Sequence, residues 1–78
     1  MNTNKEIYEG MFFGFQGRKQ KEVKAALKAL NFSEFCPPDY EPEAEAVFNL
    51  DQDLDLLIEW DPTTGVIGHV VIDEIIPR

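Results

Sequence analysis

The chain contains a single cysteine, Cys36, and a single histidine, His69. One cysteine excludes an internal disulfide framework, and one cysteine with one histidine cannot supply the three or four protein ligands of a zinc site. No apolar run reaches the length of about 20 residues that crosses a bilayer. Folding of these 78 residues is therefore expected to depend on packing in one small domain, residues 1–78, with no cofactor and no metal ion.

Lysine and arginine are absent from residues 29 to 77, a stretch that holds twelve acidic residues. Residues 1 to 28 hold six basic and three acidic residues, so the net charge of -8 conceals two parts of opposite sign. A strongly acidic surface repels nucleic acid and anionic membranes and attracts basic partners. Direct binding to nucleic acid or to a membrane is therefore not expected. The N-terminal residues show no secretion signal, and we expect a cytoplasmic protein.

The segment from Arg18 to Leu30 has the apolar spacing of an amphipathic helix. Its inward face is formed by the residues at i, i+3, i+4 and i+7, namely Val23, Ala26, Leu27 and Leu30. The opposite face is basic and comprises Lys21, Lys24 and Lys28. Asn31 predicts the end of the helix, because asparagine tolerates the left-handed conformation, and Phe32 is expected to fold back onto the last turn.

The segment from Ile7 to Phe15 fits two patterns. As a strand it alternates large side chains with a face thinned by glycines, whereas as a helix it could begin with a capping box of Thr3 and Glu6. Each glycine inside a helix costs about 1 kcal/mol, and phenylalanine favours strands. We expect a strand, although the pattern leaves the helix open.

The remainder of the chain predicts a loop followed by an antiparallel sheet. Residues 33 to 43 contain three prolines and are expected to be irregular. Two period-two runs follow: Ala44, Ala46, Phe48 and Leu50, and then Leu54, Leu56, Ile58 and Trp60. The sequence DPTTG at 61–65 predicts a hairpin, with a return strand from Val66 to Ile72. If Trp60 pairs with Gly68 or with a residue of the same parity, Val66, Val70 and Ile72 share its buried face. The predicted fold class is α+β in the order β-α-β-β-β, with one amphipathic helix packed on an antiparallel sheet.

No motif in the sequence supports catalysis or specific metal binding. The aspartates at 51, 53 and 55 resemble the start of an EF-hand loop, but its sixth position is Leu56 and its twelfth is Pro62, where glycine and glutamate are required. Cys36 and His69 are expected to have separate structural roles rather than to form a thiolate pair. The chain also has no phosphate-binding loop and no nucleophile elbow. We therefore expect a protein without enzymatic activity.

The acidic residues form the candidate partner-binding site. If Leu54, Leu56 and Ile58 face the core, their acidic neighbours project from the other face at about 6.6 to 6.8 Å per two residues. The candidate residues are Asp39, Glu41, Glu43, Glu45, Asp51, Asp53, Asp55, Leu57, Glu59 and Asp61. Leu57 would be an apolar anchor among the charges. The alternative is that these acids are only the solvated face of a sheet.

A regular array of carboxylates can imitate a phosphate backbone and occupy a groove lined by lysine and arginine. In composition, though in no shared motif, the chain resembles small acidic inhibitors of phages and plasmids, such as anti-CRISPR, anti-restriction and other nucleic-acid-mimic proteins. The first hypothesis is a non-catalytic inhibitor that binds a basic protein, either a nucleic-acid-binding protein or a nuclease. The alternative is an accessory subunit or toxin-immunity protein that binds through its aromatic N-terminal segment, with Tyr8 and Phe12 exposed. The opposite charges of the two parts also allow copies to pair as a homo-oligomer.

Overall fold

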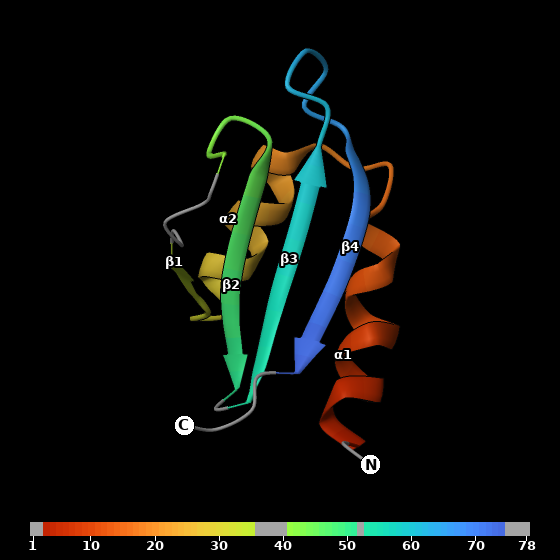
Figure 1. The fold of residues 1–78 in the computed structure, drawn as a ribbon, viewed down its shortest axis with the longest axis vertical. Coiled ribbons are helices and arrows are strands. Elements are labelled where there is room, and N and C mark those ends of the chain that lie inside the picture. The colour runs from red at the N-terminus through yellow and green to blue at the C-terminus, as the bar shows by residue number, and fades with distance from the viewer. Residues whose placement is uncertain (1–2, 36–40, 52, 75–78) are drawn as a thin grey trace.

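The computed structural model describes residues 3–35, 41–51 and 53–74. In chain order, the elements of this part are α1 (Thr3–Phe12), the 3-10 helix η1 (Phe13–Phe15), α2 (Gln20–Ala29), β1 (Ser33–Phe35), β2 (Glu45–Asp51), β3 (Leu54–Trp60) and β4 (Ile67–Glu74). The strands form one antiparallel sheet in the order β1-β2-β3-β4. In Figure 1, α2 lies behind β2 and β3 and α1 runs alongside β4. The α+β class is confirmed, but the first element of the described part is a helix where a strand was expected.

The predicted N-terminal strand is wrong, because residues 3–15 form α1 and η1. The helix turns Tyr8, Phe12 and Phe15 toward the core at the helical spacing i, i+4 and i+7. The Phe12 ring lies 5.7 Å from that of Tyr8 and 5.4 Å from that of Phe15, and the Phe32 ring packs edge-on against Phe12 at 6.0 Å. Aromatic contacts of this kind stabilise beyond the area they bury. Tertiary packing therefore outweighs the helix cost of the two glycines in this segment.

The second helix is confirmed, with a narrower buried face than the sequence predicts. Val23 and Leu27 are buried, but Ala26 and Leu30 are exposed. Asn31 has φ 68°, and its amide donates to the carbonyl of Lys28 at 3.0 Å. The Phe32 amide donates to the carbonyl of Leu27 at 3.1 Å, which completes a Schellman motif and folds the Phe32 ring back onto the core.

The inner face of the sheet follows the predicted alternation from Ala46 onward, whereas Ala44 lies in the turn before β2. Leu54, Leu56, Ile58 and Trp60 are buried along β3, and Ala46, Phe48 and Leu50 are buried along β2. The Trp60 indole is also anchored, because its Nε1 donates to the Glu43 carbonyl at 2.8 Å. One core therefore joins this face to Phe12, Val23 and Leu27 of the two helices.

The β3–β4 hairpin forms at the predicted turn, but its register contains a bulge. Trp60 pairs with Ile67 and Glu59 pairs with His69, so Gly68 is the additional residue on β4. The expected pairing of Trp60 with Gly68 or with a residue of the same parity is thus wrong. As a consequence, Ile67 is buried and takes the inward position expected for Val66, which is half-buried and bridges Lys19.

The expectation of an irregular segment at 33–43 is wrong at its start, because Ser33–Phe35 is strand β1 and pairs with β2. Residues 36–40 lie outside the described part, as does the C-terminal segment 75–78. Within the described part, neither helix has the length and apolar character needed to cross a membrane.

Candidate functional site

The face of the sheet that points away from the helices holds much of the predicted acidic site. Because directly paired residues of antiparallel strands share a face, the strand register defines which side chains lie together. We call this surface the outer face. Its residues are Ser33 and Phe35 on β1, Glu45, Val47 and Asn49 on β2, Asp55, Leu57 and Glu59 on β3, and His69, Val71 and Asp73 on β4. Figure 1 views the sheet with α2 behind it, and the described elements include no helix in front.

The centre of the outer face is apolar. Phe35 pairs with Val47, Val47 with Leu57, and Leu57 with Val71. We call these four residues the apolar row; it crosses all four strands, a span of about 14 Å at the usual strand spacing. Val47 at its centre is 8% exposed, whereas Phe35 at its end is 40% exposed. Leu57 and Val71 are half-buried.

Two acidic rows border the apolar row. One contains Asn49, Asp55 and Asp73, and the other contains Glu45, Glu59 and His69. Each lies two residues along the strands from the apolar row, a distance of about 6.6 to 6.8 Å. The sheet strands contain no lysine or arginine. The outer face therefore combines carboxylates on both sides with an apolar centre.

Both acidic rows place like charges directly opposite each other. Glu45 pairs with Glu59, and Asp55 pairs with Asp73. Directly opposed like charges destabilise a sheet. Asp55 has one compensating contact, because the Asn49 Nδ2 donates to its Oδ1 at 3.2 Å. We therefore expect the acidic rows to lower the stability of the fold, a cost that a solvated sheet face does not require.

The β2–β3 turn ends the acidic array. Asp51 pairs with Leu54 across a register shift, and the Asn49 Nδ2 donates to the Asp51 carbonyl at 3.0 Å. Asp53 lies in the turn between the strands. The predicted unbroken alternation through Asp51, Asp53 and Asp55 is therefore wrong, because the chain reverses direction there.

The other predicted acids lie at the opposite end of the sheet. Glu41 and Glu43 are exposed, in or next to the turn before β2, and the Glu41 carbonyl accepts the amides of Ala44 and Glu45. Asp61 is in the hairpin, where its Oδ1 accepts the Thr63 amide at 2.7 Å. These three residues shape turns. Asp39 lies outside the described residues.

Sequence reasoning missed the part of the outer face contributed by the edge strands and by Val47. Phe35 lies in the segment that was expected to be a loop. The sequence pattern also does not show that Val71 and Asp73 lie opposite Leu57 and Asp55 on the neighbouring strand. The parity of the return strand could have identified Val71, because it alternates with the buried Val70 and Ile72. The cross-strand alignment that makes the row cannot be obtained from one strand alone.

The basic residues lie on the other side of the molecule. Glu34 is on the inner side of β1, where its carboxylate meets Lys24 Nζ at 3.4 Å and Lys28 Nζ at 3.5 Å. Lys24 Nζ also lies 5.7 Å from the centroid of the Trp60 ring. The lysine face of α2 is thus partly neutralised within the fold.

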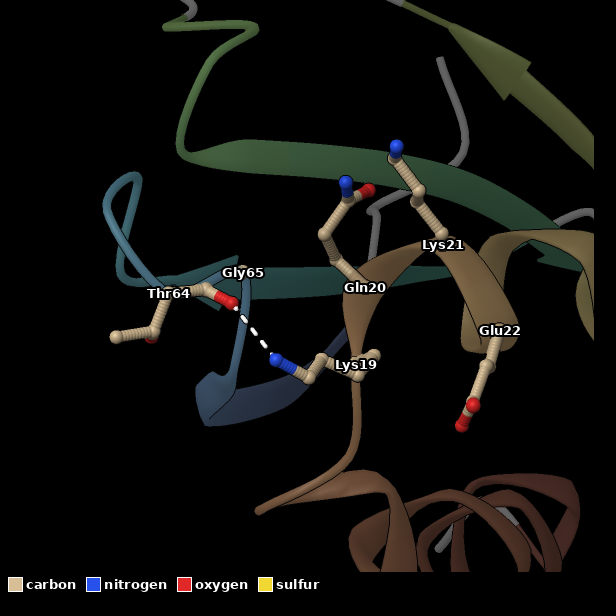
Figure 2. Close-up of a pocket in the computed structure, with 6 residues that line it drawn as sticks. All are labelled: Lys19, Gln20, Lys21, Glu22, Thr64 and Gly65. Atoms are coloured by element: carbon tan, nitrogen blue, oxygen red, sulfur yellow. Dashed lines mark hydrogen bonds between the residues drawn. The ribbon is translucent and has the colours of Figure 1, made fainter.

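A surface hollow lies where α2 begins against the hairpin, and it is lined by Lys19, Gln20, Lys21, Glu22, Thr64 and Gly65. Figure 2 shows the Lys19 amino group directed toward the Thr64 carbonyl, which it contacts at 3.1 Å, whereas Lys21 and Glu22 extend in other directions. The Gln20 amide donates to the Gly65 carbonyl at 2.8 Å. These contacts attach the start of α2 to the hairpin, so the hollow is a structural junction.

The described residues offer little support for a metal site or for thiol chemistry. Within that part, His, Cys, Asp and Glu side chains form no group of three or more that could hold a metal ion. His69 is exposed on β4 beside Glu59, and Cys36 lies outside the described part. Comparison of the chain with protein-family models, with curated proteins and with solved structures finds no match.

Proposed function

We propose that the protein is a non-catalytic binding protein that occupies the nucleic-acid-binding surface of a basic protein through its outer face. The proposal is supported chiefly by the two acidic rows, which oppose Glu45 to Glu59 and Asp55 to Asp73 at a cost in stability. Surfaces that serve only solubility mix charges of both signs. A surface that keeps like charges together instead attracts a basic partner and increases the association rate.

The proposed mechanism is electrostatic competition. Carboxylates on neighbouring strands present negative charge at regular intervals, as a phosphate backbone does. A nuclease or other nucleic-acid-binding protein that receives these carboxylates in its lysine- and arginine-lined groove cannot bind nucleic acid there at the same time. The protein would thereby act as an inhibitor and nucleic-acid mimic.

A second candidate function uses α1. Ile7 and Met11 are 55% and 51% exposed and lie one helical turn apart, and Phe13 is also exposed. This patch corrects the predicted aromatic one, because Phe12 is 1% exposed and Tyr8 is half-buried. An accessory subunit or toxin-immunity protein could bind through these residues, and such a contact would depend little on salt.

Affinity capture tests the two candidates directly. The protein is immobilised and incubated with a lysate at low salt, captured proteins are eluted by a salt step, and the purified partner is then tested for displacement of its bound nucleic acid. We expect the wild-type protein to capture a basic nucleic-acid-binding protein and to displace the nucleic acid. The double variant Asp55→Lys/Glu59→Lys should fail in both steps.

A variant with the same charge change elsewhere controls for net charge. Glu6→Lys/Glu22→Lys lies on the helices and should behave as the wild-type protein does. The proposal is rejected if both double variants lose the partner equally, since net charge alone would then be responsible. It is also rejected if only Ile7→Ser/Met11→Ser loses the partner, a result that would support the second candidate.

A further inference from the structure

The apolar row limits the kind of partner that the outer face can accept. An interface made of charge alone gains little affinity, because desolvation opposes much of the Coulomb attraction. The apolar row, by contrast, offers the desolvated centre that carries most of the binding energy in protein interfaces. Phe35 at one end and Leu57 in the middle provide the largest side chains of this centre.

From this arrangement we infer that the outer face binds an amphipathic basic helix laid across the strands, with apolar side chains on the apolar row and Lys or Arg on both flanks. The inference rests on the proposed function and specifies its partner: a protein helix bordered by cations. The flanking carboxylates are Asp55 and Asp73 on one side and Glu45 and Glu59 on the other.

The dimensions of the outer face fit a helix. The two acidic rows lie about 13 Å apart, twice the distance of two residues along a strand. A helix with its side chains is about 10 to 12 Å wide, so its lateral Lys or Arg groups reach both rows. Residues at i, i+4 and i+7 cover about 10.5 Å along the helix axis, which is comparable to the span of the apolar row of about 14 Å.

A strand fits the same surface less well. Side chains of a strand point alternately to its two faces, so a strand lying across the sheet would present an apolar face without cations on its sides. A helix presents a stripe together with both flanks. Charge on both sides of the apolar row therefore favours the helix.

Binding of a synthetic helix tests the inference. The probe is a fluorescent peptide of about 18 residues, long enough to form a helix, with leucines in one stripe and lysines on either side. The control peptide has the same composition, permuted so that the leucines no longer share a face. By fluorescence anisotropy at about 0.15 M salt, we expect the striped peptide to bind at least about 10-fold more tightly than the permuted one.

Two substitutions locate the contact on the apolar row. Leu57→Asn should lower the affinity for the striped peptide at least about 10-fold. Val71→Thr keeps the shape and strand preference of valine while adding a hydroxyl, and it should weaken binding in the same direction even if Leu57→Asn does not fold. Leu30→Asn, at the exposed apolar C-cap residue of α2, lies outside both candidate surfaces and is the control that should leave the affinity unchanged.

Each result separates this inference from the proposed function. Equal binding of both peptides, or no binding of the striped peptide, overturns the helix assignment. In that case, loss of the captured lysate partner in Asp55→Lys/Glu59→Lys would still support the proposed function as a purely electrostatic contact. If the protein alone forms a dimer and Leu57→Asn dissociates it, the occupant is a second copy of the chain, which also overturns the assignment. Unchanged affinity in both Leu57→Asn and Val71→Thr places the peptide elsewhere and has the same consequence.

Discussion

Two glycines of the β3–β4 hairpin have different roles. Gly65 has φ 73°, a conformation that costs other residues about 1 to 2 kcal/mol, and its amide donates to the Asp61 carbonyl at 2.7 Å. Gly68 is the additional residue of the bulge, and a Cβ atom added there would meet nothing within 4 Å. The backbone of Gly65, unlike that of Gly68, therefore requires glycine.

Alanine at each position tests this difference. Gly65→Ala should lower the free energy of unfolding by about 1 to 2 kcal/mol, because the turn keeps its positive φ. Gly68→Ala is the control within the same hairpin and should change it by less than about 0.5 kcal/mol. Urea denaturation followed by circular dichroism measures both. Equal losses would show that the strain is not specific to the turn.

The opposed carboxylates of Glu45 and Glu59 provide a second test at the scale of single residues. Glu59→Gln removes the repulsion and keeps the shape of the side chain, so it should stabilise the protein by about 0.2 to 1 kcal/mol. The measurement is urea denaturation at low salt, where repulsion between exposed charges is least screened. Glu41→Gln, exposed ahead of β2, makes the same charge change and should have a smaller effect. Destabilisation by Glu59→Gln would contradict a cost of the acidic rows.

At the scale of elements, the N-terminal helix is defined by its aromatic face. Phe12 is part of the core and contacts Phe15 and Phe32, whereas Met11, its neighbour in the sequence, faces away and is exposed. The Tyr8 hydroxyl lies 3.5 Å from the Leu50 carbonyl, at the end of β2. Helix α1 is thus held against the core by the aromatic side chains on one of its faces.

Alanine substitution on the inward and outward sides of α1 tests this orientation. Phe12→Ala should destabilise the protein by about 3 to 5 kcal/mol, an amount that can unfold a domain of this size. Met11→Ala should cost less than about 1 kcal/mol, because an exposed side chain buries little area. Thermal denaturation of both variants gives the comparison. A larger loss with Met11→Ala would favour the strand, in which Met11 faces inward.

Sequence patterns predicted the elements that are bounded by strong local features. The second helix has its stop at Asn31, and β3 has four alternating apolar residues that end at Trp60. The first helix was missed because two glycines and three nearby phenylalanines favour a strand locally, while the contact that decides, with Phe32, is distant in sequence. The bulge at Gly68 was missed for a similar reason, since it depends on how β4 pairs with β3.

At the scale of the whole molecule, charge and apolar surface are divided between two sides. Lys24 and Lys28 contact Glu34 on the helix side, while the outer face presents carboxylates around the apolar row. The sequence indicated the acidic candidates, but only the register showed that Asp55, Leu57 and Glu59 are one part of a wider surface. Asp51, Asp53 and Asp61 were grouped with them by spacing alone, and the turns separate them.

The surface that contacts a basic partner can be identified directly by NMR. The isotope-labelled protein is titrated with the striped lysine–leucine peptide, and the shift of each backbone amide signal is recorded. We expect the largest shifts at Val47, Asp55, Leu57, Glu59 and Val71, with small shifts at Val23 and Leu27 of α2. Largest shifts at Ile7 and Met11, or equal shifts on both sides of the sheet, would contradict this expectation.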